Sequence, residues 1–311
     1  MNSTTALSLR NDSDGEYERS TKVVSLIATQ SCIFSMAVIG NVTTLICILL
    51  SHWRQRKISR MALFIVHLSI ADLSVALFNV APNLCFLASH PKPCPFQTSV
   101  ASCKVVHYIS LVPIYGSTYI LIMTALDRYI AINHPFRARS LVNKHVHVMS
   151  GIAWMISFIF SIPQLFIYQY NEERSKCVTE WHEVERFHKR HEDIYIIWFA
   201  IAVWIFPVII LSFCYGSILV AIWRRNQGIS GKHSSSDRAK LLKPVQITLA
   251  VVLGYICCWS PWMISMLVLQ FNPIGDSTGM YTFVCKISMY YINTQLPVWD
   301  SNPQPLWHQI A

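Results

Sequence analysis

Long apolar stretches make up most of the chain, and short polar segments separate them. Hydropathy marks seven such runs, at about residues 23–50, 61–88, 100–132, 146–168, 194–223, 241–271 and 281–296. A helix needs about 20 residues to cross a hydrocarbon layer roughly 30 Å thick, and most of the runs are that long. The pattern therefore predicts an all-α fold, a seven-helix transmembrane bundle, in which the seventh helix, with 16 residues, is short.

The basic residues between the runs predict how the bundle is oriented. Clusters of Lys and Arg follow the first, third and fifth runs, whereas the opposite loops carry few basic residues or mixed charges. Because basic loops stay on the cytoplasmic side, the N-terminus is expected outside. N-glycosylation sequons at Asn2 and Asn11 agree with that orientation. We expect an extracellular tail at 1–22, a transmembrane domain at 23–296 and a divergent C-terminal tail at 297–311.

Composition narrows the class of protein. Of the 311 residues, 53% are hydrophobic and only 13% are charged, with a mean hydropathy of +0.39. Soluble proteins carry about 25% charged residues, so we expect this chain to be a membrane protein that lies in the lipid bilayer. The net charge is +9, but the basic residues do not form a face interleaved with aromatic residues, which argues against nucleic acid as a partner. No nucleophile–base set, phosphate loop or zinc-protease motif is found, which argues against an enzyme.

Landmark residues occur in order along the runs. They are Gly40-Asn41, Asp127-Arg128-Tyr129, Trp154, Pro163, Pro207 with Tyr215, and Cys258-Trp259-Ser260-Pro261. In this order and spacing the chain resembles the rhodopsin-like, class A, G-protein-coupled receptors. The resemblance implies a multi-pass receptor of the plasma membrane that activates a heterotrimeric G protein and can form receptor dimers.

The resemblance also implies a switch and a disulfide at opposite ends of the third run. Arg128 is costly near lipid, so it is expected at the cytoplasmic boundary with Asp127 as its counter-ion. Coupling to the G protein would involve these two residues and three aromatic neighbours, Tyr129, Phe136 and Tyr215. At the outer end Cys103 is expected to pair with Cys177, and whether Cys94 and Cys285 pair stays open.

A relay between the two ends is expected around two prolines. Pro207 and Pro261 remove helical hydrogen bonds and kink their helices. Trp259 is interpreted as a rotating side chain beside the second kink, with plain core filling as the alternative. Compared with the family, Tyr255 stands where Phe is usual and Thr118 where an aliphatic residue is common, so the relay is more polar.

Asp72 lies well inside the second run, where an ionisable group is costly and usually functional. In the family the matching Asp holds an allosteric sodium ion, and Asn41, Ser117 and Asn293 fall where the resemblance places oxygen-rich surroundings. Hard cations prefer such oxygen ligands. The alternative is a protonated Asp72 hydrogen-bonded to its neighbours. No other cofactor and no other metal is expected.

The ligand is expected to be a peptide. Ser110 stands where amine receptors carry an Asp, and Tyr291 where a retinal-binding receptor needs a Lys. The outer part of the bundle instead offers neutral amides and neighbouring polar or soft groups, namely Asn79, Asn83, Gln164, His107 and Met266. Neutral donors and acceptors suit peptide backbones. The segments around Asn79 and Ser117 resemble most the vasopressin/oxytocin, neuropeptide S and crustacean cardioactive peptide receptors. The alternative is that the amides only bridge helices.

Two further hypotheses compete with a signalling peptide receptor. After Gln295 the chain departs from the family pattern Asn-Pro-x-x-Tyr, and three prolines follow within nine residues, so an eighth helix is not expected. This motivates a truncated, non-signalling isoform that acts as a dominant-negative partner of a full-length receptor. A transporter or channel is the third hypothesis.

Overall fold

The computed structural model describes residues 3–55, 58–89, 99–140, 143–171, 176–179, 187–228 and 235–271. Six of its helical segments are long and apolar enough to cross a membrane, at 23–54, 60–85, 100–133, 143–167, 191–224 and 248–268. They coincide with the first six predicted runs. The seventh run, with Asn293 in it, and the tail at 297–311 lie outside the described residues, as does Asn2.

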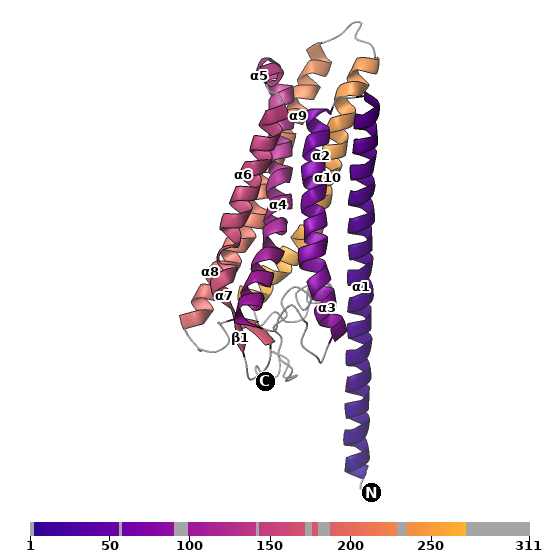
Figure 1. Cartoon of the computed structure of the whole chain (residues 1–311), viewed down its shortest axis with the longest axis vertical. Coiled ribbons are helices and arrows are strands. Elements are labelled where there is room, and N and C mark those ends of the chain that lie inside the picture. Colours follow the sequence, from indigo (N-terminus) through magenta and orange to yellow (C-terminus); the bar gives the residue numbers. More distant parts are fainter. Residues whose placement is uncertain are drawn as a thin grey trace.

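The helices stand side by side in one bundle (Figure 1). The first is α1 (Ser3–Gln55), which begins twenty residues before its apolar run and extends past the other helices at the end where β1 lies (Figure 1). Asn11 falls on this extension, and both glycosylation sites stay predictions. The remaining helices are α2 (Arg60–Val75), α3 (Ala81–Ser89), α4 (Val100–Asn133), α5 (Pro135–Ser140), α6 (Asn143–Ser161), α7 (Gln164–Ile167), α8 (Phe187–Ala200), α9 (Phe206–Gly228) and α10 (Ser235–Phe271).

Helix α4 is the centre of the bundle. The most apolar stretch of α4 is 72% buried, against at most 39% for the other five spans. Its buried side chains, among them Tyr115, Tyr119 and Ile120, form one core with side chains of α2, α6, α9 and α10. Helix α6 packs against α4 at Gly116, where a Cβ atom would lie 3.1 Å from the Trp154 ring. A larger residue at 116 would require the Trp154 ring to shift.

Two of the predicted helices are interrupted by π turns next to a proline. The second run contains η1 (Ala76–Val80), and the fifth contains η3 (Ile201–Ile205). Pro82 and Pro207 have no amide hydrogen and their rings clash with the carbonyl one turn earlier, so a regular helix cannot continue through them. The backbone widens instead, and the amide of the residue before each proline bonds five residues back. The expected kink at Pro207 is thus a π turn.

The regular helix of the fourth run ends before the apolar run does. Helix α6 stops at Ser161, a turn covers Ile162 and Pro163, and the short helix α7 leads into a two-stranded antiparallel sheet. Its strands are β1 (Tyr168–Asn171) and β2 (Lys176–Thr179), with Tyr170 opposite Cys177. The sheet lies over the first turns of α4. We call this the disulfide end of the bundle and the opposite end, which holds Arg128, the arginine end.

Candidate functional site

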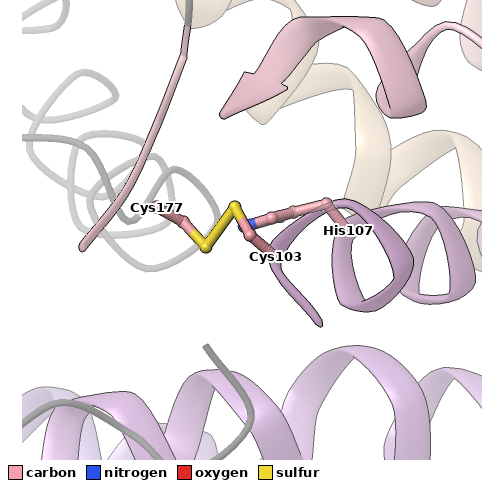
Figure 2. Close-up of side chains that lie close together, drawn as sticks. All are labelled: Cys103, His107 and Cys177. Carbon is pink, nitrogen blue, oxygen red and sulfur yellow. A yellow bond between two sulfur atoms is a disulfide. The ribbon is translucent and has the colours of Figure 1, made fainter. Parts of the chain in front are cut away.

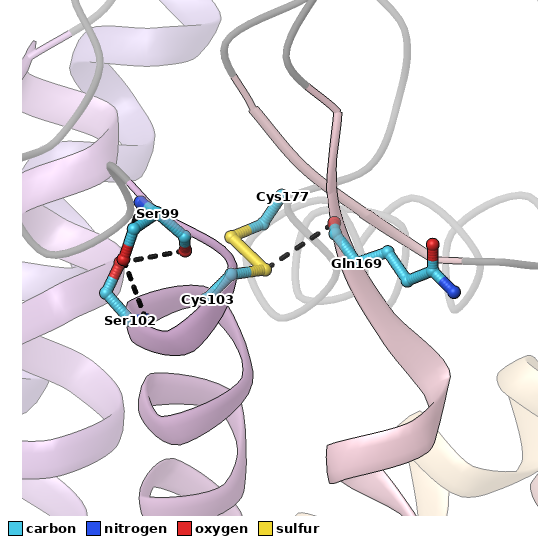
Figure 3. The surroundings of a disulfide bond; sticks show 5 residues. All are labelled: Ser99, Ser102, Cys103, Gln169 and Cys177. Atoms are coloured by element: carbon cyan, nitrogen blue, oxygen red, sulfur yellow. Dashed lines mark hydrogen bonds between the residues drawn. A yellow bond between two sulfur atoms is a disulfide. The ribbon is translucent and has the colours of Figure 1, made fainter.

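A disulfide fixes the start of α4. Cys103 and Cys177 are bonded, with their Cα atoms 5.7 Å apart, and join the first turn of α4 to β2 (Figure 2). Just before it, the Ser99 hydroxyl accepts a hydrogen bond from the Ser102 amide at 3.2 Å, and the Ser102 hydroxyl lies 3.0 Å from the Ser99 amide (Figure 3). This reciprocal capping box fixes where α4 begins, so that Cys103 lies in its first turn, where it forms the disulfide.

Three potential metal ligands meet at this disulfide. The ligand atoms of Cys103, His107 and Cys177 lie within 4.8 Å of one another (Figure 2), and they are the one such group of three among the described residues. The two sulfur atoms are bonded to each other, so neither is the thiolate that binds a metal. For the same reason the 3.6 Å approach of the Cys103 sulfur to the Gln169 carbonyl oxygen (Figure 3) is a contact without a donated proton. The oxidised pair is structural.

Polar groups predicted for the ligand pocket gather beside the disulfide. The His107 ring stacks on Tyr168, with the ring centroids 3.7 Å apart and the planes at 7°. Burial raises the pKa of the Tyr168 hydroxyl, so Tyr168 stays neutral under the imidazole. The Nε2 atom of His107 is buried and has no hydrogen-bond partner among the described residues. A buried nitrogen of this kind is costly to leave unpaired, which makes it a candidate for contact with a ligand.

The other residues predicted for the ligand pocket differ in their hydrogen bonds and in how deeply they are buried. The Gln164 amide is buried and donates to the Tyr195 hydroxyl, so it bridges α7 and α8 as the alternative interpretation expects. The Ser110 hydroxyl donates to the His107 carbonyl at 3.0 Å. On the neighbouring segments Asn79 is buried in η1, which packs against α4, whereas Asn83 and Met266 are half-buried.

Tyrosine hydroxyls repair the helix that Pro207 interrupts. The Phe206 amide bonds Ile201 across the π turn, and Pro207 has no amide hydrogen, so the Ala202 carbonyl has no donor within its own helix. It accepts the Tyr119 hydroxyl of α4 at 3.1 Å. The next carbonyl, that of Val203, accepts the Tyr255 hydroxyl of α10. The Tyr that stands where the family usually has Phe is therefore part of this repair.

A second link joins the same π turn to the region of Pro261. The Trp204 indole N–H donates to the Ser260 hydroxyl at 3.0 Å, and this hydroxyl donates to the Ile256 carbonyl at 2.6 Å. Trp259 is half-buried next to Tyr255, with the ring centroids 6.1 Å apart. Thr118 donates to the Ile114 carbonyl of its own helix at 3.0 Å. Thr118, Tyr255 and Trp259 thus lie near the place where α4, η3 and α10 meet, whereas Pro261 is exposed on α10, which continues through it as one helix.

The acidic group in the middle of the bundle has one of its predicted neighbours. The Ser117 hydroxyl donates to an Asp72 carboxylate oxygen at 2.6 Å. The Asn41 amide nitrogen donates instead to the Ala37 carbonyl of its own helix at 2.9 Å. Asn293 lies outside the described residues. Asp72 and Ser117 supply the oxygen atoms that a hard cation prefers.

At the arginine end a buried carboxylate forms ion pairs with two arginine side chains. Asp127 is 2% exposed and pairs with Arg128 on one side, while a guanidinium nitrogen of Arg60 lies 3.5 Å from its other oxygen. Arg60 opens α2, and the Ser59 hydroxyl caps that helix by accepting from the Ala62 amide at 3.2 Å. The cap therefore places Arg60 at the level of Asp127.

The aromatic residues predicted for this end occupy different surroundings. Tyr215 is buried, and its hydroxyl has no hydrogen bond of ordinary geometry although Thr248 and Arg128 lie beside it. Tyr129 packs its ring against His134 and Phe213. Phe136 in α5 is 85% exposed, which leaves its ring available to a partner.

Sequence reasoning missed three contributors to these sites. Arg60 belongs to the basic cluster after the first run, and Tyr119 and Trp204 lie in the third and fifth runs, so none of the three is predicted as a site residue. The available signals were a Ser cap next to a span boundary for Arg60, and a nearby in-helix proline for the other two. Neither signal identifies a partner, because the partners come from helices far away in the sequence.

The comparisons with known proteins agree with this geometry. A family model described as 7 transmembrane receptor (rhodopsin family) matches residues 40–295, and the chain belongs to this family. It is 35% identical to cephalotocin receptor 2 of Octopus vulgaris over 284 residues, 83% of this chain and 65% of that receptor. It is 28% identical to the neuropeptide S receptor of Rattus norvegicus over 279 residues, 85% of this chain and 71% of that receptor.

A third relative is the vasopressin V1b receptor of Mus musculus, 30% identical over 280 residues, 80% of this chain and 63% of that receptor. The chain thus spans less than two thirds of the length of the Octopus and mouse receptors. The resemblance to the vasopressin/oxytocin and neuropeptide S group is confirmed. The protein is a multi-pass membrane protein of a receptor family.

Removing one hydroxyl tests the repair at Pro207. In Tyr255→Phe the Val203 carbonyl loses its donor, which should lower the free energy of unfolding by about 1 kcal/mol, because a buried unpaired carbonyl costs roughly 1–3 kcal/mol and membrane hydrogen bonds average near the lower figure. Thermal melting of the purified protein in detergent measures it. Tyr119→Phe should behave alike, while Tyr170→Phe, whose hydroxyl has no hydrogen bond among the described residues, should melt with wild type. Wild-type melting of both core variants would contradict the repair.

Proposed function

We propose that this chain is a receptor of the plasma membrane that binds an extracellular peptide at the disulfide end and activates a heterotrimeric G protein at the arginine end. The observation that supports this most is the composition of α4, which carries His107 with its unpaired nitrogen near one end and the buried Asp127–Arg128 pair near the other. One rigid helix thus connects a polar pocket to a charged switch.

The proposed orientation follows from the ends of the bundle. The disulfide end needs an oxidising compartment, since disulfides persist outside the cytosol. The N-terminal extension of α1, with the Asn11 sequon, lies at this same end as the disulfide (Figure 1). The arginine end would then face the cytoplasm, where exposed Phe136 is available to the G protein.

The proposed ligand is a peptide like those for which the relatives are named. Relatives are receptors for cephalotocin, annetocin, neuropeptide S and vasopressin. A peptide brings many backbone donors and acceptors, which suit neutral side chains such as Asn79 and Asn83 and the unpaired Nε2 of His107. The dominant-negative hypothesis rests on residues after Gln295, outside the described ones, and stays a prediction.

Peptide-induced signalling is the direct test. Cells that express the full chain should respond to at least one of cephalotocin, annetocin, vasopressin or neuropeptide S with a saturable calcium or cyclic-AMP signal. Arg128→Ala should abolish the signal at unchanged surface level. His107→Phe keeps a ring to stack on Tyr168 but removes the nitrogens, so it should lower peptide potency about ten-fold, the cost of one lost hydrogen bond to a buried site. Normal surface expression with no response to any peptide would reject the proposal.

Arg60 is proposed to lower the cost of activation. When Arg128 leaves Asp127 in the active state, Arg60 still balances the buried carboxylate. Arg60→Gln should therefore reduce nucleotide exchange on the G protein roughly five-fold, since an uncompensated buried charge is expensive. Arg60→Lys should retain exchange, and Arg60→Gln should have no further effect in an Asp127→Asn background. Increased exchange in Arg60→Gln would show that Arg60 holds the inactive state instead.

A sodium ion at Asp72 is proposed as an allosteric inhibitor of the same switch. Asp72 and Ser117 would hold it, and it would supply a positive charge against the Asp72 carboxylate. Ligand-independent nucleotide exchange should then rise when choline replaces sodium, and Asp72→Asn should remove this sensitivity. Equal sodium sensitivity of wild type and variant would dismiss the site.

A further inference from the structure

A groove on the outer surface of the bundle lies between α4 and α9 at the arginine end. Its volume is about 690 Å³, and Tyr129 and Asn133 of α4 face residues 212–224 of α9 across it. On α9 the residues that point into the bundle, such as Leu211, Cys214 and Ile218, are fully buried. The groove uses the other face of α9, where Phe213 is 61% exposed. It therefore opens toward the membrane and is separate from the peptide pocket and the switch interior.

The length of the groove matches one leaflet of a bilayer. Ser212 and Arg224 mark its two extremes on α9. Twelve residues at 1.5 Å each span about 18 Å along a helix, and half of the hydrocarbon layer is about 15 Å thick. Because α9 crosses the membrane, the groove runs from the leaflet surface to the middle of the bilayer. An acyl chain lies in the same direction over the same depth.

The chemistry of the groove changes along its length in the way a phospholipid does. Arg224 stands at the leaflet surface, and none of the described residues that line the groove is acidic. Asn133 and Ser217 add polar groups below it, and Phe213 and Val220 provide apolar surface. The floor contains Gly216, where a Cβ atom would meet nothing within 4 Å, so the groove has room at its middle. One guanidinium at the surface end favours an anionic headgroup over a zwitterionic one.

We propose that this groove binds one anionic phospholipid of the leaflet at the arginine end, with the phosphate and headgroup at Arg224 and one acyl chain along Gly216 and Phe213. The bound lipid would contact Tyr129, which follows Arg128 in α4. The ring of Tyr129 packs against Phe213 across the groove. The lipid thereby forms part of the contact between α4 and α9. The kind of lipid bound then affects the segment of α4 that contains Arg128.

Native mass spectrometry of the full chain from nanodiscs tests the site. The discs contain equal parts of phosphatidylserine and phosphatidylcholine, and the retained lipid adducts are counted. Wild type should retain phosphatidylserine preferentially. Arg224→Gln should lower that preference about five-fold, the contribution of one basic residue near an anionic leaflet. Gly216→Leu should remove the tight adduct of either lipid because its side chain would occupy the groove, where a Cβ atom at this position meets nothing within 4 Å.

Two matched variants separate this groove from general attraction to the membrane. Arg54→Gln removes an exposed arginine at the same end of α1, and Gly151→Leu adds the same bulk to an exposed glycine of α6 that also has open space. Both should leave the adducts unchanged. The site is overturned if wild type shows no preference, if Arg54→Gln acts as strongly as Arg224→Gln, or if Gly216→Leu retains its adduct. Displacement of the lipid by soluble glycerophosphoserine would show that the headgroup alone binds, and would overturn the acyl-chain part.

Discussion

Backbone hydrogen bonding inside a hydrocarbon layer is the constraint on which this structure depends. Water is absent there, so each amide and carbonyl needs a partner within the protein. Pro207 removes a backbone donor inside the fifth span. The helix forms a π turn there, and tyrosine hydroxyls from two other helices donate to the carbonyls left without a partner. The repair ties α4 and α10 to the same backbone turn. A local defect in one helix therefore becomes the contact through which three helices are coupled.

This coupling lies between the two ends of α4 that carry the proposed functions. The disulfide and the capping box hold the first turn of α4, and Asp127 with its two arginines holds the last ones. A helix fixed at both ends transmits a shift along its axis better than it absorbs one, since protein interiors are close-packed. A ligand at His107 can influence Arg128 only if it binds the two states of the bundle with different affinity.

Charge is distributed unequally between the two ends. At the disulfide end the polar side chains predicted for the ligand pocket are amides, a hydroxyl and an imidazole. At the arginine end a carboxylate with 2% exposure is surrounded by arginines, and a further arginine marks the membrane-facing groove. Neutral groups select ligands by shape and hydrogen bonds, whereas a buried charge stores energy that is released when its partner changes. This division fits recognition at one end and switching at the other.

The sequence by itself determined the class of fold, six of the spans and the landmark residues, because the length of an apolar run and the position of a proline are local properties. It also indicated the Cys103 and Cys177 pair through the resemblance. It could not show that Gln164 bridges to Tyr195, that Asn41 turns to its own helix, or that Arg60 reaches Asp127. Those are contacts between helices or choices among rotamers, and only the packing of α4 against its neighbours decides them. The π turns at Ala76–Val80 and Ile201–Ile205 lie between the two cases, since each proline predicts a defect but the neighbouring helices decide how it is repaired.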